Sequence, residues 1–76
     1  MAIRIRAIFS DNLKRIRAEQ GISQEALALK AGAERAYIGL IERQKSSPTI
    51  DMVAKIAGVL GVEPAELLKP TKPRTK

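Results

Sequence analysis

Residues 24–43 read QEALALKAGAERAYIGLIER, and the fold follows from this stretch. Its apolar residues come in two short runs at helical spacing, and Gly32 between them can adopt the left-handed conformation that ends a helix. Two helices joined by so short a turn must cross steeply, which requires a small side chain such as Ala28 at their contact. Ile38 and Ile41 supply branched apolar groups that face back into a core. The pattern predicts a helix-turn-helix unit.

Apolar residues at helical spacing continue on both sides of this unit. Gly21 and Gly61 are stop signals, Ser23 and Thr49 are good N-caps, and Pro64 suits a first helical turn. No segment shows the period-two alternation of a half-buried strand. The sequence therefore predicts an all-α fold, a compact five-helix bundle, with helices at about residues 6–20, 24–31, 35–43, 50–60 and 64–69.

The charge of the chain is concentrated at its two ends. The 76 residues carry a net charge of +6, yet residues 7–68 contain equal numbers of basic and acidic side chains. We expect three parts: a basic N-terminal arm with the start of the first helix in residues 1–8, a domain in residues 9–68, and a disordered basic, proline-rich tail in residues 69–76. The two ends either add contacts to a polyanionic partner or are solvated and without function.

Several classes of function are excluded by composition. The chain has no Cys and no His, so it lacks disulfides, thiolate chemistry, the usual zinc ligands and the commonest general base. It has no glycine-rich phosphate loop and no apolar run long enough to cross a bilayer, and charges interrupt the apolar residues at positions 1–6, unlike the hydrophobic stretch of a signal peptide. We therefore expect a cytoplasmic protein that is not an enzyme and uses no metal or cofactor.

The stretch LKRIRAEQGISQEALALKAG (residues 13–32) resembles the Cro/XRE-like helix-turn-helix family. This family includes phage repressors, plasmid regulators, antitoxins and restriction–modification controller proteins. The resemblance continues through residues 35–43, 47–49 and 56–62, so it covers residues 9–68. It implies a lambda-repressor-like DNA-binding domain and a sequence-specific transcriptional regulator, a repressor or autoregulator. Residues 35–43 would be the recognition helix in the major groove, and a homodimer would bind a two-fold symmetric operator.

The resemblance also implies which residues contact DNA. Gln24, at the start of the second helix, would hold a phosphate. Arg35 is the best candidate for base readout, because a guanidinium can engage O6 and N7 of guanine together. The other outward positions of the recognition helix are Ala36, Tyr37, Gly39 and Leu40, and the positions that grip the DNA backbone from the following loop are Arg43, Lys45 and Ser46. Arg17 and Glu42 would form a structural ion pair instead.

Three positions leave alternatives open. Tyr37 either contacts DNA or is a half-buried ring, and Gly39 either permits close approach to a DNA strand or is simply tolerated in the helix. Glu34 stands where many members of the family have Ser or Thr, and its carboxylate can cap the recognition helix but also brings negative charge near DNA. Ala36 and Leu40 offer no hydrogen bonds, so specificity would rest partly on DNA shape.

A second class of function remains as an alternative. Antitoxin-like members of the family bind a protein partner as well as DNA, so the chain is alternatively a protein–protein interaction module. Within the DNA-binding hypothesis, the segment RAYI at residues 35–38 resembles one that is frequent in restriction–modification controllers. A homodimer interface would draw on apolar residues in the last two helices that the core does not use, among Val59, Val62, Leu67 and Leu68.

Overall fold

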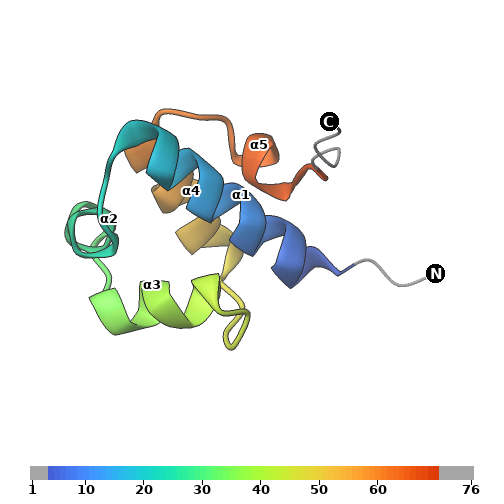
Figure 1. Cartoon of the computed structure of the whole chain (residues 1–76), viewed down its shortest axis with the longest axis horizontal. Helices are drawn as coiled ribbons and strands as arrows, with labels where there is room; N and C mark the ends of the chain where they lie inside the picture. Colours follow the sequence, from blue (N-terminus) through green and yellow to red (C-terminus); the bar gives the residue numbers. More distant parts are fainter. Residues whose placement is uncertain (1–3, 71–76) are drawn as a thin grey trace.

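The computed structural model describes residues 4–70, and these residues form five helices and no strand (Figure 1). The predicted all-α fold is confirmed. The first helix begins one residue earlier than expected, and the third and fifth end one residue earlier. The helices are α1 (Ile5–Gln20), α2 (Gln24–Ala31), α3 (Arg35–Glu42), α4 (Ile50–Leu60) and α5 (Pro64–Leu68). Residues 1–3 of the predicted N-terminal arm and residues 71–76 of the predicted C-terminal tail lie outside the described residues.

The helix ends follow the signals in the sequence. The Ser23 hydroxyl accepts a hydrogen bond from the Ala26 N–H at 3.0 Å and caps α2. The Thr49 hydroxyl does the same for α4, accepting from the Met52 N–H at 3.0 Å. Short polar side chains at these positions satisfy N–H groups that have no partner within the helix. Both predicted N-caps are therefore confirmed.

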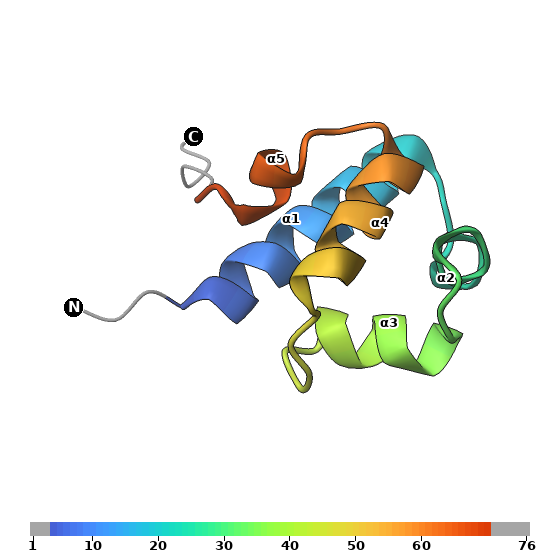
Figure 2. The same cartoon turned by 180° about the vertical axis from the view of Figure 1, so that it is seen from behind.

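A single core of buried side chains holds the five helices together, and Figures 1 and 2 show how the helices are arranged. α1 packs against α3, α4 and α5, while α2 packs against α3 and α4. α2 lies at the opposite end of the molecule from the start of α1, and α3 runs along one edge between these ends. The inner face of α3 is fixed in the core, while its outer face remains at the surface. The buried apolar residues are Phe9, Leu13, Ile16, Leu27, Ala28, Ala31, Ile38, Ile41, Val53, Ile56, Ala57, Leu60 and Leu67.

Two buried polar side chains of α1 connect it to the ends of other helices. The Ser10 hydroxyl donates to the backbone carbonyl of Glu42, the last residue of α3, at 2.7 Å. The Asn12 amide donates to the carbonyls of Leu67 and Lys69 at the end of α5, both at 2.9 Å. Carbonyls at helix C-termini lack partners within their own helix, so these bonds satisfy them. Both side chains therefore fix where α3 and α5 end relative to α1.

Candidate nucleic-acid interface

The turn between α2 and α3 sets the direction of the outer helix. Gly32 takes φ of 72°, and the Ala33 N–H donates to the Ala28 carbonyl at 2.9 Å. This left-handed turn ends α2 and redirects the chain within three residues, so α3 starts at Arg35. Ala28 and Ile38 are both buried. The predicted helix-turn-helix unit is confirmed, with its second helix along the edge of the molecule (Figure 2).

The outward side of α3 is narrower than the sequence predicts. Arg35, Ala36 and Leu40 are exposed, as expected for positions that can face DNA. Tyr37 is partly buried and packs against the core, as the half-buried alternative predicted. Gly39 is buried, although its backbone position lies on the outward arc of the helix. A DNA contact by Gly39 therefore remains a prediction, and in the free protein this position is covered by other side chains.

Two polar side chains cover Gly39. A Cβ atom at this position would lie 3.2 Å from Nη1 of Arg43 and 3.9 Å from Oε1 of Gln24. The absence of a side chain therefore lets the Arg43 guanidinium lie back along α3 beside the Gln24 amide. The structure thus gives Gly39 a role that neither alternative from the sequence included. It makes room for the guanidinium of Arg43, a candidate DNA contact of this chain.

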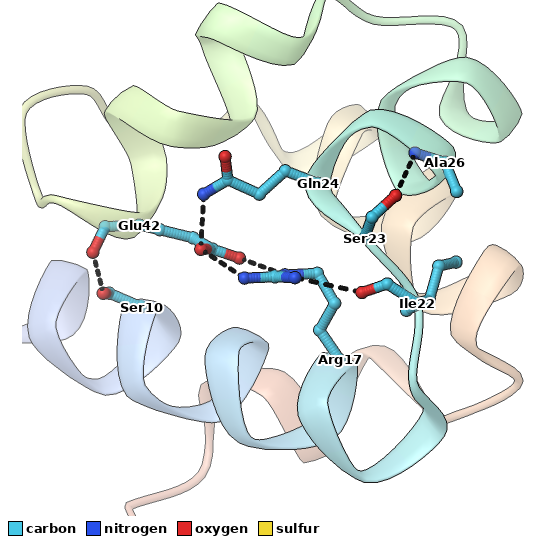
Figure 3. Close-up of polar contacts among 7 residues, drawn as sticks. All are labelled: Ser10, Arg17, Ile22, Ser23, Gln24, Ala26 and Glu42. Carbon is cyan, nitrogen blue, oxygen red and sulfur yellow. Dashed lines mark hydrogen bonds and ion pairs between the residues drawn. The ribbon is translucent and has the colours of Figure 1, made fainter.

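Behind this surface, the carboxylate of Glu42 gathers donors from two other helices (Figure 3). It accepts from Nε of Arg17 at 2.7 Å and from Nη2 at 2.9 Å, a bidentate ion pair between α1 and α3. A third bond comes from Nε2 of Gln24 at 2.9 Å. The Glu42 side chain is 4% exposed and that of Arg17 21%. The predicted structural pair of Arg17 and Glu42 is present in this geometry.

The hydrogen bond from Gln24 to Glu42 fixes the orientation of the Gln24 side chain, which the sequence did not indicate. Because one N–H of the amide donates to Glu42, the side chain is held in one orientation and its Oε1 points away from the carboxylate (Figure 3). Arg17 also donates to the carbonyl of Ile22 at 3.0 Å, just before α2 begins. The ion pair therefore positions both the start of α2 and the first side chain of that helix.

The loop after α3 is more regular than its polar composition suggests. Gln44 has φ of 63°, and its N–H donates to the Ile41 carbonyl at 3.0 Å. The Lys45 N–H donates to the Leu40 carbonyl at 2.8 Å. These two bonds form a Schellman motif, which glycine usually completes. Gln44 takes the glycine position here, so no stop signal marks this helix end in the sequence. The motif nevertheless fixes the backbone that carries Arg43 and Lys45.

The charges on this surface are largely unpaired. Arg35, Arg43 and Lys45 are exposed, and none forms an ion pair within the part of the chain that the structure describes. Ser46 is partly buried beside them. Glu34 takes the N-cap position of α3, but its carboxylate makes no capping bond. The predicted capping by Glu34 is therefore wrong, because N-capping favours shorter side chains that reach back to the first N–H groups.

Comparison with known proteins identifies the family. The sequence model of the helix-turn-helix family HTH_3 matches residues 13–67. The chain belongs to this family. Control protein C.BamHI from Bacillus amyloliquefaciens is 38% identical over 69 residues, which cover 90% of this chain and 85% of that protein.

Two solved structures of the helix-turn-helix family resemble the fold closely. The hypothetical transcription factor NHTF from Neisseria gives a TM-score of 0.84 at 35% identity, covering 87% of this chain and 76% of that one. The restriction–modification controller C.AhdI from Aeromonas hydrophila gives 0.79 at 35% identity, covering 82% and 94%. As a member of this family, the protein is a DNA-binding transcriptional regulator, and the relatives do not favour the interaction-module alternative.

Two features that would indicate another class of function are absent from the described residues. Residues 4–70 contain no cluster of acidic side chains that could hold a metal ion. No helix in the same range is long and apolar enough to cross a membrane. The family members compared above are regulatory DNA-binding proteins and not enzymes.

Proposed function

We propose that this regulator binds a specific operator by placing α3 in the major groove, with Arg35 reading a guanine. The observation that carries the proposal is that one face of α3 is buried in the core and the opposite face is exposed. Its inner face is locked in the core by Ile38 and Ile41, while Arg35, Ala36 and Leu40 remain exposed. A rigid helix with an exposed Arg near its N-terminal end is the arrangement that reads base edges in such domains.

Phosphate contacts on both sides of α3 would hold this helix in register. The start of α2 carries free backbone N–H groups and the oriented Gln24 amide, which together suit a phosphate. The second set of phosphate contacts lies at the end of α3 and comes from Arg43, Lys45 and Ser46. Because Arg43 and Lys45 have no carboxylate partner within residues 4–70, no ion pair has to break when they meet phosphates.

Base readout in this proposal is sparse. Leu40 and Ala36 can contact a thymine methyl group but donate no hydrogen bond. Glu34, uncommitted to a cap, either accepts from the N4 amino group of a cytosine or weakens binding by repulsion. Tyr37 packs against the core, so a DNA contact by its hydroxyl remains a prediction. Much of the specificity would then depend on the shape and deformability of the operator.

A homodimer on a two-fold operator completes the proposal, since one recognition helix contacts only a few base pairs. We infer that the regulator works in the cytoplasm and represses its own promoter. The similarity to C.BamHI and C.AhdI supports the controller hypothesis for the RAYI segment. A restriction gene beside the coding sequence would support it further, and a toxin or phage gene there would count against it.

A titration against the upstream promoter and a scrambled duplex, at several salt concentrations, tests the proposal. We expect a preference of about 10³-fold or more for the promoter, with affinity falling steeply as salt rises. Equal weak binding to both duplexes, or no binding at low salt, would contradict sequence-specific recognition of this promoter.

Three variants separate the proposed roles. Arg35→Ala should lower promoter affinity by about 10–100-fold and flatten the preference between sequences. Lys45→Ala should weaken all duplexes alike and reduce the salt slope by about 0.9. Lys55→Ala, an exposed lysine of α4, is the matched control and should change neither. If Lys55→Ala weakens binding as much as Lys45→Ala, the surface is assigned to the wrong face.

A further inference from the structure

Arg43 follows the last residue of α3, yet its guanidinium lies back over the middle of that helix. A Cβ atom on Gly39 would lie 3.2 Å from Nη1 and 4.0 Å from Cζ of Arg43. Gly39 precedes Arg43 by four residues, so the two positions are neighbours on one side of the helix, and side chains on a helix tilt toward its N-terminus. The Arg43 guanidinium therefore occupies the space that a side chain at position 39 would fill.

We propose that Arg43, from this position over Gly39, reads a second guanine of the operator. The inference rests on the proposed function, in which α3 enters the major groove and Arg35 reads the first guanine. It changes one assignment made there: Arg43 contacts a base, and Lys45 and Ser46 remain as the backbone contacts at the end of α3. The guanidinium has the donors for this role, because two of its N–H groups can engage O6 and N7 of one guanine.

The middle of α3 has no other hydrogen-bond donor to offer a base. Ala36 and Leu40 are exposed, but their side chains are apolar, and Gly39 has none. In a helix that lies in the major groove, this part of the outward side faces base edges, whereas phosphates lie at the edges of the groove. The guanidinium of Arg43 therefore brings donors to the place where a base edge would be read.

The amide of Gln24 favours this position of the guanidinium. Its Nε2 donates to Glu42 at 2.9 Å, so its Oε1 points away from the carboxylate (Figure 3). Oε1 lies 3.9 Å from the same Cβ position over Gly39, so its partial negative charge is beside the Arg43 guanidinium. The Glu42 carboxylate itself accepts from Arg17 and Gln24 and forms no ion pair with Arg43. The guanidinium is thus positioned by a neutral group and needs no ion pair to break before it meets a base.

The spacing along α3 predicts where the second guanine lies. Arg35 and Gly39 are four residues apart, which is about 6 Å along a helix that rises about 1.5 Å per residue. Successive base pairs are about 3.4 Å apart along DNA. The guanidiniums of Arg35 and Arg43 would therefore meet base pairs about two steps apart. We expect two guanine preferences in each half-site at this spacing, one for each arginine.

Selection from a library of randomised duplexes, followed by titration of single base-pair changes in the selected site, tests this assignment. Arg43→Lys is the decisive variant, because it keeps the charge and removes the planar fork that engages two acceptors. We expect it to lose about 10-fold or more of the discrimination at one guanine, with the salt dependence of binding unchanged. Arg35→Ala should lose the preference at the other guanine and keep this one.

Gly39→Ala tests the position of the guanidinium without changing Arg43. The new Cβ displaces Nη1, so discrimination at the same guanine should fall. Combining Gly39→Ala with Arg43→Lys should lower this discrimination no further than Arg43→Lys alone, because both changes remove one contact. Gly58→Ala is the matched control, since Gly58 lies within α4 and a Cβ there meets no atom within 4 Å. It should leave every base preference unchanged, and circular dichroism checks that all variants are folded.

The outcomes separate failure of this inference from failure of the proposed function. If the wild type selects a site and Arg35→Ala loses one guanine preference, while Arg43→Lys keeps every preference, Arg43 is a phosphate contact and the inference is overturned with the proposed function standing. An equal loss of affinity for all duplexes in Arg43→Lys would overturn it in the same way. A wild type that enriches no sequence from the library would contradict the proposed function and, with it, the second guanine.

Discussion

Replacing Arg17 by Met tests the role of the ion pair behind the DNA-facing surface. Met keeps most of the apolar stem of Arg17 and removes its charge. It leaves the Glu42 carboxylate, whose side chain is 4% exposed, with one of its three donors, the Gln24 amide. Stranding a buried charge in this way costs about 3–5 kcal/mol. Because the Arg17 side is 21% exposed and water can enter there, we expect a loss of about 3 kcal/mol.

A loss of this size is large for a chain of 76 residues. Domains of this length have free energies of unfolding of roughly 4–11 kcal/mol, and each 1 kcal/mol shifts the melting temperature by about 4–8 °C. Arg17→Met should therefore lower the melting temperature by roughly 12–24 °C. Urea unfolding followed by circular dichroism measures the loss of unfolding free energy, and thermal unfolding measures the shift of the melting temperature. The protein concentration must be the same for every variant, because dimerisation would itself shift the apparent stability.

Arg15→Met is a matched control on the same helix. Arg15 pairs with Glu19 at 3.4 Å, with side chains 38% and 62% exposed, and donates a long hydrogen bond of 3.3 Å to Oδ1 of Asn12, so its loss should cost about 1 kcal/mol. The double variant Arg17→Met with Glu42→Leu removes both charges and should be more stable than Arg17→Met alone. If Arg17→Met costs no more than Arg15→Met, or if the double variant loses the sum of both single losses, the carboxylate is not a stranded charge and the reasoning fails.

Three further changes have expected outcomes in the same unfolding assay. Asn12→Ala should cost about 2 kcal/mol and lower the hydrogen-exchange protection of α5, because the Leu67 carbonyl loses its donor. Gln44→Gly should raise the unfolding free energy by about 0.5–1 kcal/mol, since φ of 63° is unfavourable for Gln. An unchanged unfolding free energy would contradict this and mean that Gln44 leaves the left-handed conformation in solution. Gly39→Ala should also stabilise α3, by up to about 1 kcal/mol, yet weaken promoter binding, because the new Cβ lies 3.2 Å from the Arg43 guanidinium and displaces it.

Much of the fold could be predicted because it depends on local signals. Ser23 and Thr49 cap their helices, and glycines end three of them at the expected positions. These features require only a short polar side chain, or a residue without Cβ, at one point of the chain. Gln44 shows the limit of such signals. It adopts the same left-handed conformation as the glycines, imposed by the contacts at the end of α3 and not by its own preference.

Long-range polar contacts were beyond prediction from residue types. The residue types of Ser10 and Asn12 do not indicate that these side chains are bonded to the ends of α3 and α5. The position of Asn12 one residue before Leu13, on the inward arc of α1, is the signal that could have suggested burial. Gly39 shows a related limit of the sequence. The helical periodicity places its backbone correctly, but only the structure shows Arg43 covering it.

The carboxylate and the backbone carbonyl of Glu42 support both the packing of the helices and the proposed DNA-facing surface. Its carboxylate joins α1 to α3 through Arg17 and orients Gln24 at the start of α2, while its backbone carbonyl accepts from Ser10. The end of the proposed recognition helix and a proposed phosphate contact are thus held by one buried residue. Gln24 keeps this orientation only while the Glu42 side chain stays in place to accept its N–H. Repairing the stability of a Glu42 variant elsewhere in the fold would therefore not restore the phosphate contact, because the orientation of the Gln24 amide has no other support among the hydrogen bonds of the described chain.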